Sequence, residues 1–138
     1  MMADEPKIEY PFPAIQDYTE GYWQGAIGGK IRAQQCKACG YVRLPPTAHC
    51  SQCLSTRSKW VDLSGHGSIW SWVIMHRPYF KHHWQVPPYL VALVRLDEGP
   101  LISAAIDADQ ERLAVGKKLR ARLEEVAPGR FLPVFELT

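Results

Sequence analysis

The chain contains no long hydrophobic run and no segment that resembles a targeting signal. None of its stretches approaches the roughly 18 uncharged apolar residues that a membrane-spanning helix requires. Residues 1–6 (Met-Met-Ala-Asp-Glu-Pro) are acidic and polar, unlike an export or transit sequence. Internal repeats and low-complexity tracts are also missing. We therefore expect neither a membrane protein nor a repeat protein, but a protein of the cytoplasm or another reducing compartment.

The sequence also lacks a marked excess of charge of one sign. Sixteen basic and fourteen acidic side chains give a formal net charge of +2. A dedicated nucleic-acid-binding protein usually carries a clear positive excess, because contacts to phosphates dominate its affinity. The total charge therefore argues against that class.

Charge is nevertheless distributed unevenly along the chain. Residues 30–62 hold Lys30, Arg32, Lys37, Arg43, Arg57 and Lys59 against the single acid Asp62. Such a cluster is consistent with a basic face that meets a phosphorylated ligand or an acidic protein surface. A solvated surface with no binding role fits the same distribution equally well.

Only four cysteines are present, in two pairs of identical spacing, Cys36-Lys-Ala-Cys39 and Cys50-Ser-Gln-Cys53. A two-residue gap lets one tight turn present two thiolates to the same ion, so two such turns supply the ligands of a tetrahedral zinc site. Two disulfides are the alternative, but C-x-x-C pairs in a chain without an export signal more often bind metal. A thioredoxin-type redox motif is disfavoured, because that motif occurs once and opens a helix of a βαβ unit.

The predicted metal is one structural Zn²⁺ ion per chain. Four sulfur ligands leave no coordination position for water or substrate, which excludes a directly catalytic zinc. His49, next to Cys50, is a potential fifth ligand, but a closed tetrahedron makes it a surface residue. Metal binding is worth on the order of 10 kcal/mol in structural sites, and it would supply most of the stability of so small a unit.

The chain divides into three predicted parts. An N-terminal arm and helix occupy residues 1–30, a zinc ribbon residues 31–60, and a β domain residues 61–138. Within the ribbon, an alternating strand leads into the first cysteine pair, and a second short strand leads out of it.

A helix is predicted from Ile15 to Ile27, with Asp17 or Thr19 as its cap and Gly28-Gly29 as its end. Its apolar stripe consists of Tyr18, Tyr22, Trp23 and Ile27. So many aromatic side chains on one helix predict that it docks, either on the rest of this chain or on a partner protein.

From residue 59 onward, apolar and polar residues alternate with a period of two, which is typical of half-buried strands. The strand candidates are residues 59–64, 67–76, 89–97, 100–107, 117–125 and 130–136. Short strands, with one connection that includes about one helical turn, predict a small closed barrel of the OB type. The predicted fold class is therefore mostly β: an N-terminal helix, a rubredoxin-like zinc ribbon and a small OB-fold β-barrel.

Six motifs follow one another along nearly the whole chain. They are Tyr22-Trp23, Cys36-x-x-Cys39-Gly40, Pro45-Pro46, Cys50-x-x-Cys53, Gly65-His66-Gly67 and the run from Pro88 to Pro100. Together they resemble the acyl-CoA-associated family whose members join a rubredoxin-like zinc ribbon to an OB fold. The C-x-x-C pairs alone are common to many ribbons, and it is their combination with the last run that is specific.

Resemblance to this family implies a non-catalytic partner of a thiolase-like enzyme, a lipid-transfer-type thiolase homologue or an acyl-CoA hydratase. It implies that the chain docks on such an enzyme and helps to hold or pass on an acyl-CoA thioester. Two positions depart from the family pattern: Ser51 replaces a frequent proline, and Thr47 replaces a frequent arginine. Neither departure removes a metal ligand, but the resemblance implies no basic contact at Thr47.

Residues 76–88 form a predicted loop, and loops are where binding residues tend to lie. The candidate ligand or partner contacts are Arg77, Tyr79, Phe80, Lys81 and Trp84 of this loop, with Tyr22 and Trp23 of the helix. Such side chains could stack on an adenine and pair with the phosphates of CoA, or anchor a protein partner. They could equally fold back over the mouth of the barrel, and the sequence leaves the three alternatives open.

An active site would need a nucleophile with a base, or an acid–base pair, in one cleft. The obvious titratable groups are His66, His76, His82 and His83. No serine or carboxylate lies near His82 and His83 at an informative spacing, and the cysteines are committed to metal. We therefore expect no catalysis by this chain alone.

Single-stranded nucleic-acid binding is the rival hypothesis, because OB barrels use exposed aromatic residues and a basic groove for it. Trp70 and Trp72 are candidates for a stacking platform. Their alternation places them on the same face as Ile74, which predicts that they point into the barrel. This placement and the small net charge make nucleic acid the less favoured partner.

Overall fold

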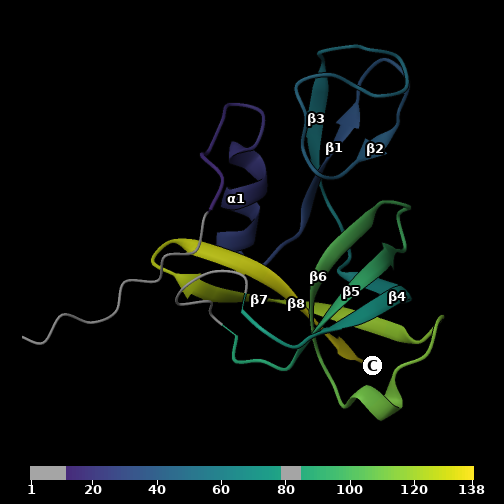
Figure 1. Ribbon diagram of the computed structural model, residues 1–138. Coiled ribbons are helices and arrows are strands. Elements are labelled where there is room, and N and C mark those ends of the chain that lie inside the picture. Colours follow the sequence, from purple (N-terminus) through teal and green to yellow (C-terminus); the bar gives the residue numbers. More distant parts are fainter. Residues whose placement is uncertain (1–11, 79–84) are drawn as a thin grey trace, which may run out of the picture.

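The computed structural model describes residues 12–78 and 85–138. It contains a short helix, a three-stranded antiparallel sheet and a closed barrel, with the helix and the small sheet on the same side of the barrel (Figure 1). The elements are α1 (Glu20–Ile27), β1 (Arg32–Cys36), β2 (Val42–Arg43), β3 (Ser58–Asp62), β4 (His66–Met75), β5 (Tyr89–Leu96), β6 (Leu101–Asp107), a 3₁₀ helix (Gln110–Arg112), β7 (Lys118–Ala127) and β8 (Arg130–Leu137). Within the two described ranges, no helix has the length and apolar character needed to cross a membrane.

Helix α1 is shorter than the sequence predicts. It begins at Glu20 instead of Ile15. The residues before it form a turn, in which the Thr19 hydroxyl accepts a hydrogen bond from the N–H of Gln16 at 2.8 Å and donates one to its carbonyl oxygen at 3.2 Å. The hydroxyl closes that turn and makes no capping bond to the helix. The helix ends at Ile27 with Gly28 as its cap, as predicted.

The buried face of α1 also differs from the predicted stripe. Tyr18 and Ile27 of that stripe are 41% and 57% exposed. A Cβ atom on Gly21 would fall within the indole ring of Trp60, so glycine allows the helix to approach the ribbon closely. The helix therefore packs through three small residues together with Trp23, the one buried member of the predicted stripe. The buried positions are Gly21, Trp23, Gly25 and Ala26.

An arginine from the β7–β8 hairpin ties α1 to the barrel. The guanidinium of Arg130 lies 4.6 Å from the ring of Trp23 and 5.2 Å from that of Phe12. Its Nη2 donates a hydrogen bond to the carbonyl oxygen of Pro13 at 3.2 Å. The aromatic helix thus docks on its own chain, which is one of the two alternatives predicted for it.

Alternation along the barrel strands places the core as predicted. Ala92, Val94 and Leu96 of β5 are 1%, 0% and 1% exposed. Strands β4, β5 and β6 follow one another in the sheet, and the barrel closes through the parallel pair β6–β8 and the antiparallel pairs β7–β8 and β4–β7. This closed barrel confirms the predicted OB type.

One apolar core runs through the base of the ribbon and the barrel. Ile31 and Ala33, which are 2% and 0% exposed, belong to the same cluster as Leu63, Ile69 and Phe135. The N–H of Leu63 donates to the carbonyl oxygen of Ile31 at 2.8 Å where the two modules meet. The ribbon is therefore packed on the barrel and is not a freely tethered finger.

The prediction that Trp70 points into the barrel is wrong. A β-bulge interrupts the pairing of β4 with β5 between Ile69 and Ser71, and Trp70 is left without a paired residue. Because one extra residue shifts the alternation, Ile69 is 1% exposed whereas Trp70 is 53% exposed. Trp72 packs against the core, as predicted.

We expect Gly21→Ala to destabilise the protein, although alanine favours helices by about 1 kcal/mol over glycine. The new methyl group would overlap the Trp60 ring, and overpacking of this kind typically costs about 1–3 kcal/mol. The urea midpoint of unfolding measures the effect. Gly28→Ala is the matched control, because its Cβ would lie 3.5 Å from the nearest atom. Equal midpoints for the two variants would contradict the close approach.

Candidate functional site

The cysteine pairs lie at the end of the ribbon that points away from the barrel. Cys36 is the last residue of β1 and pairs with Ser58, the first residue of β3. Strand β3 then runs back toward the barrel and ends at Asp62, a few residues before β4. The ribbon therefore carries its candidate metal ligands at the end remote from the apolar core.

The first C-x-x-C turn is closed by backbone hydrogen bonds. The N–H of Cys36 donates to the carbonyl oxygen of Tyr41, and the N–H of Gly40 donates to that of Cys36, both at 2.9 Å. Gly40 adopts a φ of +80°, which glycine accommodates without strain. This geometry brings the sulfurs of Cys36 and Cys39 to the same side of the turn.

The second C-x-x-C turn repeats the first bond for bond. The N–H of Cys50 donates to the carbonyl oxygen of Ser55 at 2.9 Å, and the N–H of Leu54 donates to that of Cys50 at 2.8 Å. Leu54 occupies the position of Gly40 and has a φ of +65°. The equal spacing of the two pairs in the sequence thus produces two equivalent turns that face each other.

The four sulfur atoms form one compact cluster. Sγ of Cys36 lies 3.5 Å from Sγ of Cys53, and Sγ of Cys39 lies 3.7 Å from Sγ of Cys50. All four lie within 4.8 Å of one another. Sulfurs bound tetrahedrally at about 2.3 Å to one zinc ion would be separated by about 3.8 Å. The cluster therefore fits a single tetrahedral metal ion, and no S–S bond is formed.

Backbone donors favour the charged form of two of these sulfurs. The N–H of Cys39 donates to the sulfur of Cys36 and lowers the pKa of that thiol to about 6. Burial acts to raise the pKa of Cys50, but backbone donors led by the N–H of Gln52 outweigh it and lower that pKa. The N–H of Gln52 lies 3.4 Å from the Cys50 sulfur. One cysteine of each turn thus favours the thiolate, which is the form that binds metal. The N–H groups of Tyr41 and Ser55 act to lower the pKa of Cys39 and Cys53, but the neighbouring sulfurs and burial outweigh them and raise both pKa values.

A buried polar network joins the ribbon to the turn before α1. The amide of Gln34 donates to the carbonyl oxygen of Tyr18 at 3.1 Å and accepts the N–H of Thr47 at 2.8 Å. Arg43, which is 5% exposed, donates from Nε to the Thr47 hydroxyl at 3.0 Å. Thr47, which replaces an arginine frequent at this position in the family, thus holds Arg43 from the end of β2, four residues earlier in the chain. The sequence offered no signal for this contact.

A groove of about 1220 Å³ lies between α1, the double proline of the ribbon and the outer face of β5 and β6. In OB folds, the second and third barrel strands form the usual ligand-binding face, and here these strands are β5 and β6. None of the described residues that line the groove carries a charge. The residues that define its walls and floor include Tyr18, Tyr22, Pro45, Pro46, Val91, Leu93, Leu101 and Ser103.

The structure assigns different environments to the predicted contact residues. Tyr22 is half-buried in the wall of the groove, and burial raises the pKa of its hydroxyl. Trp23 is 7% exposed, and its ring meets that of Tyr22 edge to face at 5.3 Å. Arg77 is exposed beyond the end of β4. The other predicted contacts, Tyr79, Phe80, Lys81 and Trp84, lie outside the described residues, as do His82 and His83.

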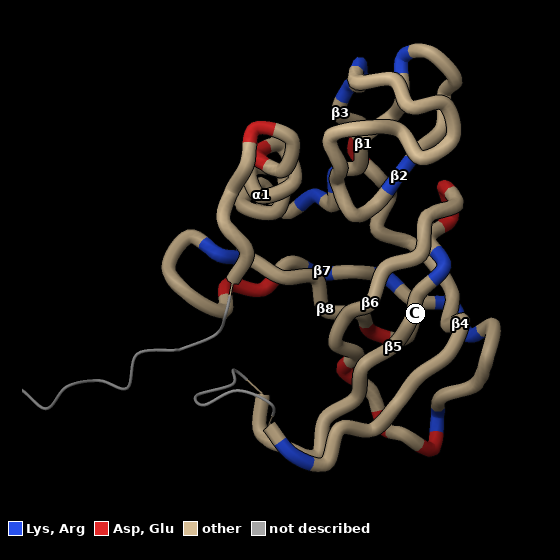
Figure 2. The backbone as a smooth tube through the Cα atoms, turned by 45° about the horizontal axis from the view of Figure 1, so that its top comes forward, with Lys and Arg blue, Asp and Glu red and all other residues tan. Residues whose placement is uncertain are grey.

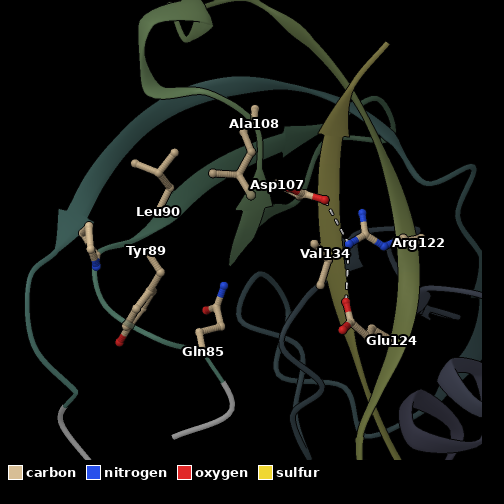
Figure 3. Close-up of a pocket in the computed structure, with 10 residues that line it drawn as sticks. Gln85, Tyr89, Leu90, Asp107, Ala108, Arg122, Glu124 and Val134 are labelled. Carbon is tan, nitrogen blue, oxygen red and sulfur yellow. Dashed lines mark hydrogen bonds and ion pairs between the residues drawn. The ribbon is translucent and has the colours of Figure 1, made fainter.

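A smaller pocket of about 330 Å³ opens beside β6 and β7 (Figure 3). Its carboxylates are paired: Arg122 lies 3.2 Å from Asp107 and 3.4 Å from Glu124. Gln85 and Tyr89 complete the polar part of its wall. No serine, cysteine, histidine or lysine is among the described residues that line this pocket. Its chemistry is that of a charged, hydrogen-bonding surface.

The bulge in β4 exposes Trp70, a candidate stacking residue that the sequence placed inside the barrel. The guanidinium of Arg95 lies 4.7 Å over the ring of Trp70, and its Nη1 donates to the carbonyl oxygen of Gly99 at 3.0 Å. The sequence alternates regularly through this strand, so nothing in the pattern signals the bulge.

A tetrathiolate ribbon packed on an OB barrel defines the class of two-module zinc-ribbon and OB-fold proteins. Residues 23–58 match the family profile described as "ChsH2, rubredoxin-like zinc ribbon domain", and residues 60–124 match "ChsH2, C-terminal OB-fold domain". The chain belongs to this ChsH2-type zinc-ribbon and OB-fold family, also called DUF35.

Three known proteins illustrate the family. A "probable enoyl-CoA hydratase alpha subunit" of Thermomonospora curvata is 31% identical over 95% of this chain, which spans only 41% of that subunit. A "DUF35 domain-containing scaffold protein" of Methanocaldococcus jannaschii is 30% identical over 63% of this chain and 62% of its own length. A solved structure titled "Ltp2-ChsH2(DUF35) aldolase" is 29% identical, with a TM-score of 0.81, over 91% of this chain and 98% of that one.

We expect Cys36→Ser to lose the bound metal and to yield an insoluble or partly unfolded protein, because three sulfurs cannot close the tetrahedron that holds the two turns. Elemental analysis of protein purified without added metal should find about one ion per chain in the unmodified protein. His49→Ala is the control, since His49 is exposed and outside the sulfur cluster. Metal retained by Cys36→Ser, or lost by His49→Ala, would refute this ligand set.

Proposed function

We propose that the chain is a non-catalytic accessory protein of an acyl-CoA enzyme. It binds a thiolase-like, lipid-transfer-type or hydratase enzyme and supports the handling of CoA thioesters by that enzyme. The observation that carries this proposal is the uncharged groove of about 1220 Å³ on the ligand-binding face of the OB barrel. The names of the hydratase subunit, the scaffold protein and the aldolase complex support the same class of partner.

The metal in this proposal is a single structural Zn²⁺ ion. The donor set supports this choice, because four thiolates are typical of structural zinc and leave no open position for catalysis. Residues Cys36, Cys39, Cys50 and Cys53 hold the ion. A cluster of free thiols also supports the cytoplasm as its location, since a reducing compartment keeps thiols available for metal.

The groove supports an apolar ligand or a protein partner. Its floor consists of aliphatic side chains such as Val91, Leu93 and Leu101, and its walls include Tyr22 and Pro46. An acyl chain or an apolar protein segment would bury this surface at about 25 cal/mol per Å². The phosphates of a nucleotide would find no cation among the described lining residues.

Nucleic-acid binding is the second candidate function, favoured by one observation. The exposed Trp70 ring with Arg95 stacked on it resembles the aromatic and cationic pairs that hold single-stranded bases. The uncharged groove and the net charge of +2 count against it.

Affinity purification of the tagged chain from its native host tests the partner. We expect mass spectrometry to identify a thiolase-like or hydratase enzyme that is absent from a control purification with the tag alone. Failure to recover such an enzyme, together with tight and strongly salt-dependent binding to a single-stranded oligonucleotide, would replace this function with the second candidate.

The role of the groove is tested by placing a charge in it. Ser103 lines the groove and is exposed, so Ser103→Glu adds a carboxylate without disturbing the core. Because burying an unpaired charge is costly, we expect affinity for a long-chain acyl-CoA to fall at least about tenfold in isothermal titration. Ser71→Glu is the matched control: Ser71 and Ser103 pair with opposite sides of Leu93, but Ser71 is not among the groove residues. Equal affinities for the two variants would contradict a ligand in the groove.

A further inference from the structure

The two equivalent turns of the metal site differ at one informative position. Each requires a positive φ at the residue after its second cysteine, and Gly40 meets this requirement in the first turn. Leu54 occupies the corresponding position in the second turn, and it is the one non-glycine residue with positive φ in the described part of the chain. A left-handed conformation costs an ordinary residue roughly 1–2 kcal/mol, a cost that glycine avoids.

Packing within the chain does not offset this strain. The Leu54 side chain is 74% exposed, so it contributes almost nothing to the core. Its backbone N–H is bonded to the carbonyl oxygen of Cys50 at 2.8 Å, which fixes the direction in which the side chain leaves the turn. A leucine that is strained and rigidly displayed gains free energy only when another surface covers it.

The surroundings of Leu54 indicate the character of that surface. Residues 33–61 contain Lys37, Arg43, Arg57 and Lys59 and no acid. The N–H of Lys37 donates to the carbonyl oxygen of Arg57 at 3.1 Å, so these two exposed cations belong to adjacent backbone segments. Across the described ranges, no carboxylate forms an ion pair with Lys37, Arg57 or Lys59. Figure 2 shows basic positions on the outer loops of the ribbon.

A second exposed apolar side chain comes from the first turn. Tyr41 follows Gly40 and is 42% exposed. The metal-bearing end of the ribbon thus combines a strained leucine and a tyrosine with unpaired cations. Tyrosine and arginine are enriched among residues that dominate binding energy in protein interfaces.

We propose that this end of the ribbon is a docking knob for a protein, in which Leu54 enters an apolar pocket whose rim carries carboxylates. Leu54 and Tyr41 supply the apolar contact, and Lys37 and Arg57 supply charge complementarity with the rim. This inference rests on the proposed function, because it assigns the knob to the acyl-CoA enzyme that the chain binds. It is separate from the groove, whose described lining contains none of these residues.

The test is Leu54→Gly, measured by quantitative recovery of the partner enzyme with the tagged full-length chain from the native host. Glycine relieves the backbone strain, so the variant should keep its metal and unfold at the same or a higher temperature. Removal of the side chain should nevertheless lower recovery at least about tenfold, as expected for a central interface residue. Val115→Ala is the control, because Val115 is 70% exposed but lies outside the ribbon.

Each outcome of this experiment decides between specific claims. Normal recovery with Leu54→Gly overturns the docking knob and leaves the proposed function intact. Failure to recover the enzyme even with the unmodified chain overturns both. Equal losses with Leu54→Gly and Val115→Ala would show a general effect of surface hydrophobicity and would also overturn the knob. As a second measurement, Lys37→Glu should slow association with the recovered enzyme and weaken the dependence of that rate on salt.

Discussion

The outer part of the ribbon is organised around four cysteine sulfurs that lie within 4.8 Å of one another. Thiolates held within 4.8 Å of one another repel strongly unless a cation sits between them. The backbone N–H groups of Cys39 and Gln52 favour the charged sulfurs at Cys36 and Cys50, whereas neighbouring sulfurs and burial raise the pKa of Cys39 and Cys53. A bound cation would stabilise all four thiolates, and we expect the turns to be poorly stable without one. In the proposed tetrahedral site, the ion would fix both turns and with them the exposed side chains of Tyr41 and Leu54.

Apart from the cysteine cluster, the structure presents two candidate binding surfaces. The barrel offers an uncharged groove, whose wall includes α1 and whose floor is the outer face of β5 and β6. The wall is fixed relative to the floor because Arg130 joins the β7–β8 hairpin to Trp23 and Pro13. The ribbon offers a small, basic and partly apolar end on the outside of the molecule. Such a division suits a protein that holds two other molecules in a fixed relation, which is the proposed role beside an acyl-CoA enzyme.

The sequence predicted what is encoded in spacing and alternation. Two equal C-x-x-C gaps predict one tetrahedral site, and the alternation of β5 predicts its buried side chains, because both depend only on local geometry. The prediction from sequence failed where a single residue changes the backbone geometry or the packing. The bulge beside Ile69 turns Trp70 outward without any change in the pattern. Gly21 lets α1 approach the ribbon closely beside the buried Trp23, so that Tyr18 and Ile27 of the predicted stripe stay exposed. The contacts of Gln34 with Tyr18 and Thr47 join residues that are far apart in the sequence, and nothing in the local pattern signals them.

The shared core of ribbon and barrel has a consequence for regulation. Ile31 and Ala33 belong to the ribbon by sequence, yet they pack in the same cluster as Ile69 and Phe135 of the barrel. Loss of a bound ion would therefore loosen the packing between the ribbon and the barrel as well as the outer turns. The two modules would then unfold together, as one cooperative unit. In the proposed accessory role, the supply of metal in the cell would therefore set the amount of folded accessory protein and, through it, the activity of the acyl-CoA enzyme that the chain supports.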